Sequence, residues 1–235
     1  FKQQEGQVIQ GIVSRKDRKG NVIVDLGKIN GFLPAREQSK RDNYRPGNRM
    51  TFLLKEVSDG PRGPEIILSR AGKEMIQSVF MQEIPEIETG EVEIKGVARE
   101  AGARSKVAVY TDDDSIDPVG ACIGQRGSRI GTIIDWLGGE KIDIVIYEED
   151  PIQYIKNALS PAKVDDVELD EETKEAIVRV PEDQYSLAIG RGGQNVRLAG
   201  ELTGWTLNIE HDGEVPAELE DESVDIAEDA EAEDA

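Results

Sequence analysis

Two stretches of the chain read Cys122-Ile123-Gly124-Gln125-Arg126-Gly127 and Ala188-Ile189-Gly190-Arg191-Gly192-Gly193. Each is a Gly-x-x-Gly loop that follows an apolar segment, and matching residues lie 66 positions apart. The hydrophobic pattern around both loops predicts the same order: helix, strand, strand, helix, loop, helix, strand. Chance does not duplicate a pattern of seven elements, so the sequence predicts a repeated unit.

The first copy is predicted to open with a helix over 72–83, which Pro85 ends and whose apolar face holds Met75, Ile76, Val79 and Phe80. Ser128 is predicted to cap the helix after the first loop. The remaining segments of the first copy are strands near 91–99 and 106–110, helices at 117–123 and 128–137, and a strand at 142–147. The second copy has helices at 152–159, 182–189 and 194–202, and strands at 164–169, 176–180 and 205–209.

The loops have the chemistry of a phosphate site. The leading glycine allows a sharp turn, and the trailing glycine lets a ligand backbone come close. Free N–H groups of the following helix point at the ligand, and Arg126 or Arg191 adds a cation. Ile123 and Ile189 are expected to form an apolar floor for bases. A Walker loop requires Gly-Lys-Ser/Thr, which the chain lacks. A dinucleotide fingerprint requires a glycine where Arg126 stands in the first loop, or where Asn195 stands after the second.

The first 70 residues contain five short apolar runs separated by turn signals such as Lys19-Gly20-Asn21 and Pro46-Gly47. Five strands in this length predict a small closed β-barrel.

The charge is distributed unevenly. The formal net charge is −20, but residues 1–70 carry 14 basic and 8 acidic side chains, and residues 211–235 carry twelve acids without Lys or Arg. A nucleic-acid site must therefore be a local basic patch. The segment 213–235 is expected to be a disordered acidic tail.

Other features of composition exclude whole classes of protein. One cysteine rules out a disulfide framework and a thiolate zinc site, which fits a cytoplasmic location. No apolar run reaches membrane-spanning length, so no membrane partner is expected. The chain begins with Phe1, which suggests a fragment of a longer protein.

The repeated unit resembles the KH family in its prokaryotic (type II) topology, whose loop clamps about four nucleotides of single-stranded nucleic acid. The barrel resembles an S1-type OB-fold at 6–11 and 66–70. The fold class is thus a multidomain chain: an all-β barrel (1–70) followed by two α+β KH domains (71–150 and 151–212). This order is similar to a family of bacterial transcription termination/antitermination factors, with close agreement at 17–27, 116–122, 139–145, 157–164 and 187–190.

The resemblance implies binding of single-stranded nascent RNA and regulation of transcription elongation, pausing, termination and antitermination. RNA polymerase is an implied partner, mainly through a domain before Phe1, and other antitermination factors are further candidates. We expect a monomer without cofactor, metal or catalytic residues. The expected RNA-binding residues are Gly124, Gln125, Arg126, Gly127, Ser128, Arg129, Gly190, Arg191, Gly192, Gly193, Gln194 and Arg197. Arg104 and Lys106 are weighed as extensions of the same track.

The barrel departs from the wider S1 pattern, because Val22 and Val24 stand where stacking aromatics are common. Phe32 is the nearest aromatic, and it is interpreted as a core residue. The barrel is therefore expected to contact mainly the RNA backbone.

Several single residues have ordinary interpretations. Cys122 is expected in the core, His211 in solvent, Asp112–Asp114 in a charged turn, and Trp136 and Trp205 packed within the KH units.

The alternative functions are an RNA-binding subunit of an RNA-processing or degradation enzyme, and a protein scaffold that uses the acidic tail. A nuclease assay with magnesium or manganese and a tail deletion distinguish them.

Overall fold

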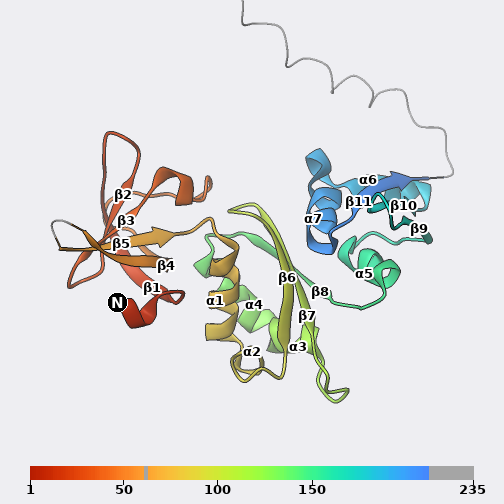
Figure 1. The fold of residues 1–235 in the computed structure, drawn as a ribbon, viewed down its shortest axis with the longest axis horizontal. Helices are drawn as coiled ribbons and strands as arrows, with labels where there is room; N and C mark the ends of the chain where they lie inside the picture. The colour runs from red at the N-terminus through yellow and green to blue at the C-terminus, as the bar shows by residue number, and fades with distance from the viewer. Residues whose placement is uncertain (61–62, 212–235) are drawn as a thin grey trace, which may run out of the picture.

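The computed structural model describes residues 1–60 and 63–211, and its elements lie in three groups along one row (Figure 1). A barrel stands at one end, a three-stranded sheet with helices lies in the middle, and a second sheet with helices lies at the other end. The predicted acidic tail, 213–235, lies outside the described residues. No described helix is both long and apolar enough to cross a membrane.

The barrel closes in the order β1-β2-β3-β5-β4, as the five apolar runs predicted. Its one parallel pairing joins β3 to β5. Alternating side chains fill the interior, among them Val22, Val24, Leu33, Leu54 and Leu68. The strands are β1 (Val8–Lys16), β2 (Val22–Asp25), β3 (Asn30–Leu33), β4 (Arg49–Gly60) and β5 (Gly63–Ser69), with short 3-10 turns η1 (Lys2–Gln4) and η2 (Ala35–Glu37).

The first module runs from α1 to β8, and its sheet has the order β6-β7-β8. The central β7 pairs antiparallel with β6 and parallel with β8. All four residues of the predicted apolar face of α1 are buried. The elements are α1 (Lys73–Glu83), α2 (Pro85–Glu88), β6 (Glu93–Glu100), β7 (Arg104–Tyr110), α3 (Pro118–Ile123), η3 (Gln125–Gly127), α4 (Ser128–Trp136) and β8 (Lys141–Ile146).

The short helix α2 is a feature that the sequence analysis missed. Pro85 does follow the end of α1, but it also occupies the first turn of α2. The fixed φ of proline suits that position, and its missing N–H leaves no bond unmade there. A proline that ends one helix can therefore begin the next.

The second module runs from α5 to β11 and repeats the topology of the first. Its sheet has the order β11-β10-β9, and the central β10 is antiparallel to β9 and parallel to β11. The predicted repeat is therefore confirmed. The elements are α5 (Pro151–Ala158), β9 (Asp166–Asp170), β10 (Glu175–Arg179), α6 (Glu182–Ile189), η4 (Arg191–Gly193), α7 (Gln194–Thr203) and β11 (Thr206–Glu210).

The two modules share a hydrophobic core. Ala108 of β7 and Val145 of β8 belong to the same buried cluster as Ile155 of α5 and Ala199 of α7. Lys106 is fully buried at this seam, where its Nζ lies 3.2 Å from Asp143 Oδ2 and 3.0 Å from the Ser160 carbonyl oxygen. The seam between the modules is thus continuous packing rather than a loose linker.

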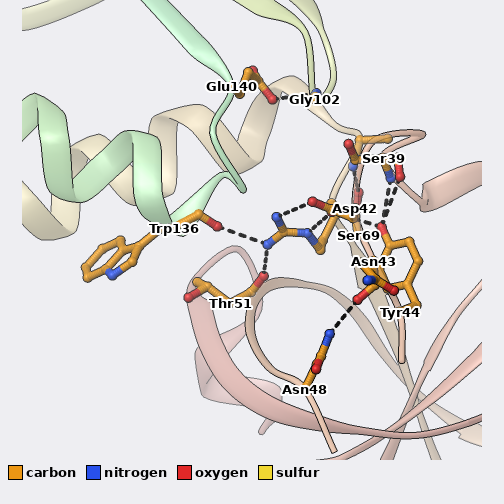
Figure 2. Close-up of polar contacts among 12 residues, drawn as sticks. Ser39, Asp42, Asn43, Tyr44, Asn48, Thr51, Ser69, Gly102, Trp136 and Glu140 are labelled. Carbon is orange, nitrogen blue, oxygen red and sulfur yellow. Dashed lines mark hydrogen bonds and ion pairs between the residues drawn. The ribbon is translucent and has the colours of Figure 1, made fainter. Parts of the chain in front are cut away.

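The barrel joins the first module through apolar packing and one buried arginine. Leu53 of β4 belongs to the core cluster of α1. The Arg70 guanidinium donates to the Asp42 carboxylate and the Thr51 carbonyl in the barrel, and to the Trp136 carbonyl (3.1 Å) at the end of α4 (Figure 2). Its side chain is 2% exposed. A single buried charge therefore bonds both sides of this junction.

Candidate nucleic-acid interface

The first loop turns through three left-handed backbone positions. Gly124 has φ 73° and ψ 175°, Arg126 has φ 54° and ψ 27°, and Gly127 has φ 76° and ψ 20°. α3 ends at Ile123, one residue before this turn, and α4 begins one residue after it. The loop therefore presents the N-terminus of α4 at its outer side.

The second loop has nearly the same backbone. Gly190 has φ 75° and ψ 171°, Gly192 has φ 59° and ψ 31°, and Gly193 has φ 70° and ψ 14°. Two loops with different middle residues thus adopt one conformation. That agreement favours a shared role over two accidental helix–helix turns.

The position of the loop arginine differs between the copies. Arg126 is the third loop residue and takes a left-handed conformation that costs a non-glycine residue about 1–2 kcal/mol. The second loop places glycine there and moves its arginine to the second position, Arg191. Both arginines are exposed. Each loop therefore offers one cation to solvent.

The leading glycines are required by packing inside the protein. A Cβ on Gly124 would lie 2.8 Å from Cγ of Arg129, and a Cβ on Gly190 would lie 2.8 Å from Cβ of Asn195. The trailing glycines are open, because the nearest atoms to a Cβ on Gly127 or Gly193 are 3.9 and 3.7 Å away. The trailing glycines, unlike the leading ones, therefore leave room for a ligand backbone, and so does Gly192 in the middle of the second loop.

Arg129 and Asn195 occupy equivalent positions and both turn back beneath their loops. Arg129 Nη1 lies 2.7 Å from the Ala121 carbonyl oxygen and 2.8 Å from Glu86 Oε2. Asn195 is buried, and its Nδ2 donates to the carbonyls of Leu159 and Ala188, each at 3.0 Å. Arg129, which the sequence predicted as an RNA contact, is thus placed to support the loop. Nothing in the sequence pattern marks Asn195 as part of the site, because an asparagine in a helix is usually a surface residue.

The start of α4 differs from the prediction in its cap. Gly127, not Ser128, is the N-cap, and the Ser128 side chain makes no capping bond. Ser128 already has helical φ and ψ, and its N–H donates to the Gln125 carbonyl. The left-handed glycine turns the chain one residue earlier than a serine cap requires.

A cavity of about 590 Å³ adjoins the first loop. Its lining combines backbone of the loop and helix start with the Glu86–Arg129 ion pair. The lining residues are Glu86, Gly120, Ala121, Gly124, Gln125, Ser128 and Arg129.

Other predicted cations are already paired. Arg104 makes two bonds to Asp143, at 2.7 and 3.0 Å, and Lys106 is buried beside the same carboxylate. Burial outweighs the attraction of Asp143 and lowers the pKa of Lys106. Lys106 therefore belongs to the seam between the modules, and it is not a surface extension of the phosphate track.

The outer face of the barrel carries a short apolar row. Val22 and Val24 point into the core, whereas Ile23 pairs with Phe32, and Phe32 pairs with Ile67 across β2, β3 and β5. These three side chains are half-buried. The interpretation of Phe32 as a core residue is wrong, because strand alternation turns it outward next to two aliphatic side chains.

Most of the residues for which the sequence predicts an ordinary structural role have that role in the structure. Cys122 is fully buried, and burial, with Glu86 nearby, raises the pKa of its thiol to about 12. Trp205 is buried, and Trp136 packs partly against the core of the first module. His211 is not simply solvated, since its ring lies 4.5 Å from that of Tyr185. Within 1–60 and 63–211 no group of three His, Cys, Asp or Glu side chains could hold a metal ion.

Comparison with known families matches the three groups of elements in turn. Residues 2–70 match the model of the S1 RNA binding domain, residues 70–147 the NusA-like first KH domain, and residues 151–217 the NusA-like second KH domain.

Curated relatives match over nearly the whole chain. The transcription termination/antitermination protein NusA of Thermus thermophilus is 50% identical over 210 residues, which is 89% of this chain and 54% of the relative. NusA of Bacillus subtilis is 46% identical over 94% of this chain and 61% of its own length. NusA of Mycobacterium tuberculosis H37Rv is 43% identical over 92% and 65%. The chain thus spans a little over half the length of these relatives.

Proposed function

Because the chain belongs to the NusA-like family, with an S1 domain before two KH domains, we propose that it binds single-stranded nascent RNA and regulates bacterial transcription elongation, pausing, termination and antitermination. The observation that carries the RNA-binding part is the pair of Gly-x-x-Gly loops with one backbone conformation. The domain limits proposed are 1–70, 71–150 and 151–212.

The proposed RNA contact is a backbone clamp. A phosphate approaches the open side of Gly127 or Gly193, where a side chain would otherwise stand. The N–H groups at the start of α4 or α7 and the exposed Arg126 or Arg191 complete the site. The remaining contacts are assigned to Gly124, Gln125, Ser128, Gly190, Gly192, Gln194 and Arg197.

Two weak clamps on one rigid body bind one strand more tightly than either alone. The continuous core between the modules fixes the loops relative to each other, which raises the effective concentration of the second contact. The net charge of −20 opposes a polyanion elsewhere on the surface. Binding should therefore be modest, salt-sensitive and dependent on both loops.

The barrel is proposed to add an apolar contact. Phe32, with Ile23 and Ile67 beside it, offers a half-buried platform on which one base can stack. The charge excess of residues 1–70 attracts the RNA backbone to the same domain.

For the whole protein, RNA polymerase and other antitermination factors are the proposed partners, in a monomer located in the cytoplasm. The role proposed for these 235 residues is the RNA contact, without catalysis. RNA should accordingly be recovered intact after incubation with the protein and magnesium or manganese.

The double variant Gly127→Asp with Gly193→Asp tests the proposal. Both positions have room for a Cβ, and aspartate tolerates the left-handed conformation better than most residues. The variant should fold, since a Cβ at either position meets no atom closer than 3.7 Å. The new carboxylates repel phosphate, so RNA binding in a polarisation assay should be abolished.

A matched control is Gly90→Asp with Gly204→Asp. These glycines also have positive φ (81° and 77°) and open space, and each module contains one of them away from its loop. The control should bind like the original protein. Equal affinity of the loop variant and the control would refute the proposed site.

A further inference from the structure

The second loop meets a carboxylate that belongs to the first module. Glu100 is the last residue of β6, and its side chain lies against the first turn of α7. Its carboxylate accepts hydrogen bonds from Gln194 Nε2 at 2.7 Å and from Arg197 Nε and Nη2 at 2.8 and 2.5 Å. These are two oxygens bound by three donors, the arrangement in which a guanidinium and an amide bind a phosphate.

The two donors stand at the loop itself. Gln194 follows Gly193 directly and is the first residue of α7. Arg197 Nη1 donates to the Gly192 carbonyl at 3.1 Å and would lie 3.7 Å from a Cβ on Gly193. The carboxylate of Glu100 therefore binds two side chains, Gln194 and Arg197, that border the open side of the second loop.

Packing, rather than this ion pair, holds the two modules together. α7 lies against β6, where a Cβ on Gly96 would meet Leu202 at 3.3 Å. The Tyr154 hydroxyl of α5, also in the second module, would lie 3.6 Å from the same Cβ. The side chain of Arg197 is 57% exposed and that of Glu100 is 31% exposed, so their pair contributes little to folding. The pair can open without separating the modules.

The first loop has no equivalent contact among the described residues. The position that matches Arg197 is Gly131, and the ion pair of Arg129 with Glu86 lies at the position of buried Asn195. The two loops have the same backbone conformation, but only the second has a basic residue, Arg197, at the fourth position of the following helix.

We propose that Glu100 is part of the RNA site of the second loop, where it competes with an RNA phosphate for Arg197 and Gln194. In the free protein the carboxylate occupies both donors, and a bound phosphate takes its place. This inference rests on the proposed function, since it needs RNA at the second loop. Glu100 thereby lowers the affinity of the second loop for RNA, and the first loop has no such competitor among the described residues.

The charge of Glu100 is present throughout the neutral range. Burial alone would raise the pKa of this carboxyl, but the hydrogen bonds from Gln194 and Arg197 and the charge of Arg197 outweigh it, so the pKa lies below its ordinary value. At neutral pH both the competitor and the RNA phosphates are therefore charged.

Glu100→Gln tests the inference, because glutamine keeps the size of the side chain and removes its charge. Polarisation with a single-stranded RNA of about 12 nucleotides, three times the length that one loop clamps, should show about threefold to fivefold tighter binding at low salt. The slope of log affinity against log salt should steepen by about 0.7, the value for one more phosphate contact.

Glu201→Gln is the matched control. Glu201 also lies on α7 and pairs across the same seam, with Lys73 at 2.5 Å, so its replacement removes the same charge and a comparable ion pair. Because Glu201 lies away from the loop, its replacement should change the affinity for RNA by less than about twofold. Equal gains in the two variants, or weaker binding by Glu100→Gln, would overturn the inference.

The Arg197→Gln background decides whether the gain passes through this arginine. In that background the gain from Glu100→Gln should shrink to the part that passes through Gln194, no larger than the change in Glu201→Gln, whereas an undiminished gain contradicts the competition. Failure of the proposed function is a separate result, because in that case the original protein and the Gly127→Asp, Gly193→Asp variant bind RNA alike. Thermal unfolding of each variant confirms that the modules stay assembled.

Discussion

Asn195 shows how one residue can set the shape of a binding loop without facing the ligand. Its amide reaches two carbonyls, one in the helix before the loop and one at Leu159, while its Cβ fills the space beneath Gly190. Arg129 does the same beneath Gly124 with a longer side chain and a partner, Glu86. Different residues thus meet one structural demand in the two copies.

Replacing Asn195 with alanine should therefore destabilise the protein by about 1–3 kcal/mol, because two buried carbonyls lose their donor. Urea unfolding measures this change. Gln194→Ala, one residue away and at the surface, should stay within about 0.5 kcal/mol. Equal stability of the two variants would show that the amide does not support the loop.

The reactivity of Cys122 tests whether the helix before the first loop is packed as described. Because burial raises the pKa of its thiol to about 12, a thiol reagent such as DTNB should not react with the native protein at pH 8. The same reagent should react with one equivalent after unfolding in urea, when the ordinary thiol pKa of about 8.5 returns. Rapid labelling of the native protein contradicts the burial of this helix.

Some of these single-residue roles could be predicted from the sequence and others could not. The loops, their glycines and the core position of Cys122 could be predicted from pattern and residue type. The direction of Arg129 could not, because a basic residue beside a phosphate loop fits both an RNA contact and an internal support. The hydrogen bonds of Arg129 to the Ala121 carbonyl and to Glu86, 43 positions earlier, distinguish the two.

Among the elements, hydrophobic periodicity predicted the order of the helices and strands that the two modules share, and it placed their bounds within about two residues. It failed where two physical rules give different answers. A proline after a helix indicates an end, yet Pro85 also starts α2. An isolated aromatic suggests core, yet the alternation of β3 turns Phe32 outward. The exact domain limits stay a prediction.

The two glycines of a loop should respond differently to alanine. Gly190→Ala adds a Cβ at 2.8 Å from Asn195 Cβ and 2.9 Å from its backbone N, in a left-handed conformation, so it should cost about 2–4 kcal/mol. Gly193→Ala meets no atom closer than 3.7 Å and should cost only about 1–2 kcal/mol. Denaturant unfolding of the pair checks the order, and the reverse order would be inconsistent with this loop geometry.

At the scale of the whole molecule, three groups of elements act as one body because their junctions are packed and bonded. Arg70 joins the barrel to the first module, and Lys106 and Glu100 lie at the seam between the modules. Sequence patterns place such residues in an element but do not show which distant segment they meet. The interfaces therefore had to come from the structure.

Arg70→Met should separate the barrel from the first module. It leaves the Asp42 carboxylate buried without its partner, a loss of about 3–5 kcal/mol. Tryptophan fluorescence reports the two modules, which contain Trp136 and Trp205, whereas far-UV circular dichroism also reports the barrel. The unfolding transitions followed by these two signals should coincide in the original protein and separate in the variant. An unchanged curve would mean that apolar packing alone joins the two parts.

The central claim is that both Gly-x-x-Gly loops hold one RNA strand. Ultraviolet crosslinking of the chain to a single-stranded RNA, followed by mass-spectrometric mapping of the crosslinked peptides, tests it most directly. We expect crosslinks in the peptides that contain 124–129 and 190–197. Both should be lost in Gly127→Asp with Gly193→Asp and kept in Gly90→Asp with Gly204→Asp. Crosslinks confined to the barrel, or unchanged in the loop variant, would contradict it.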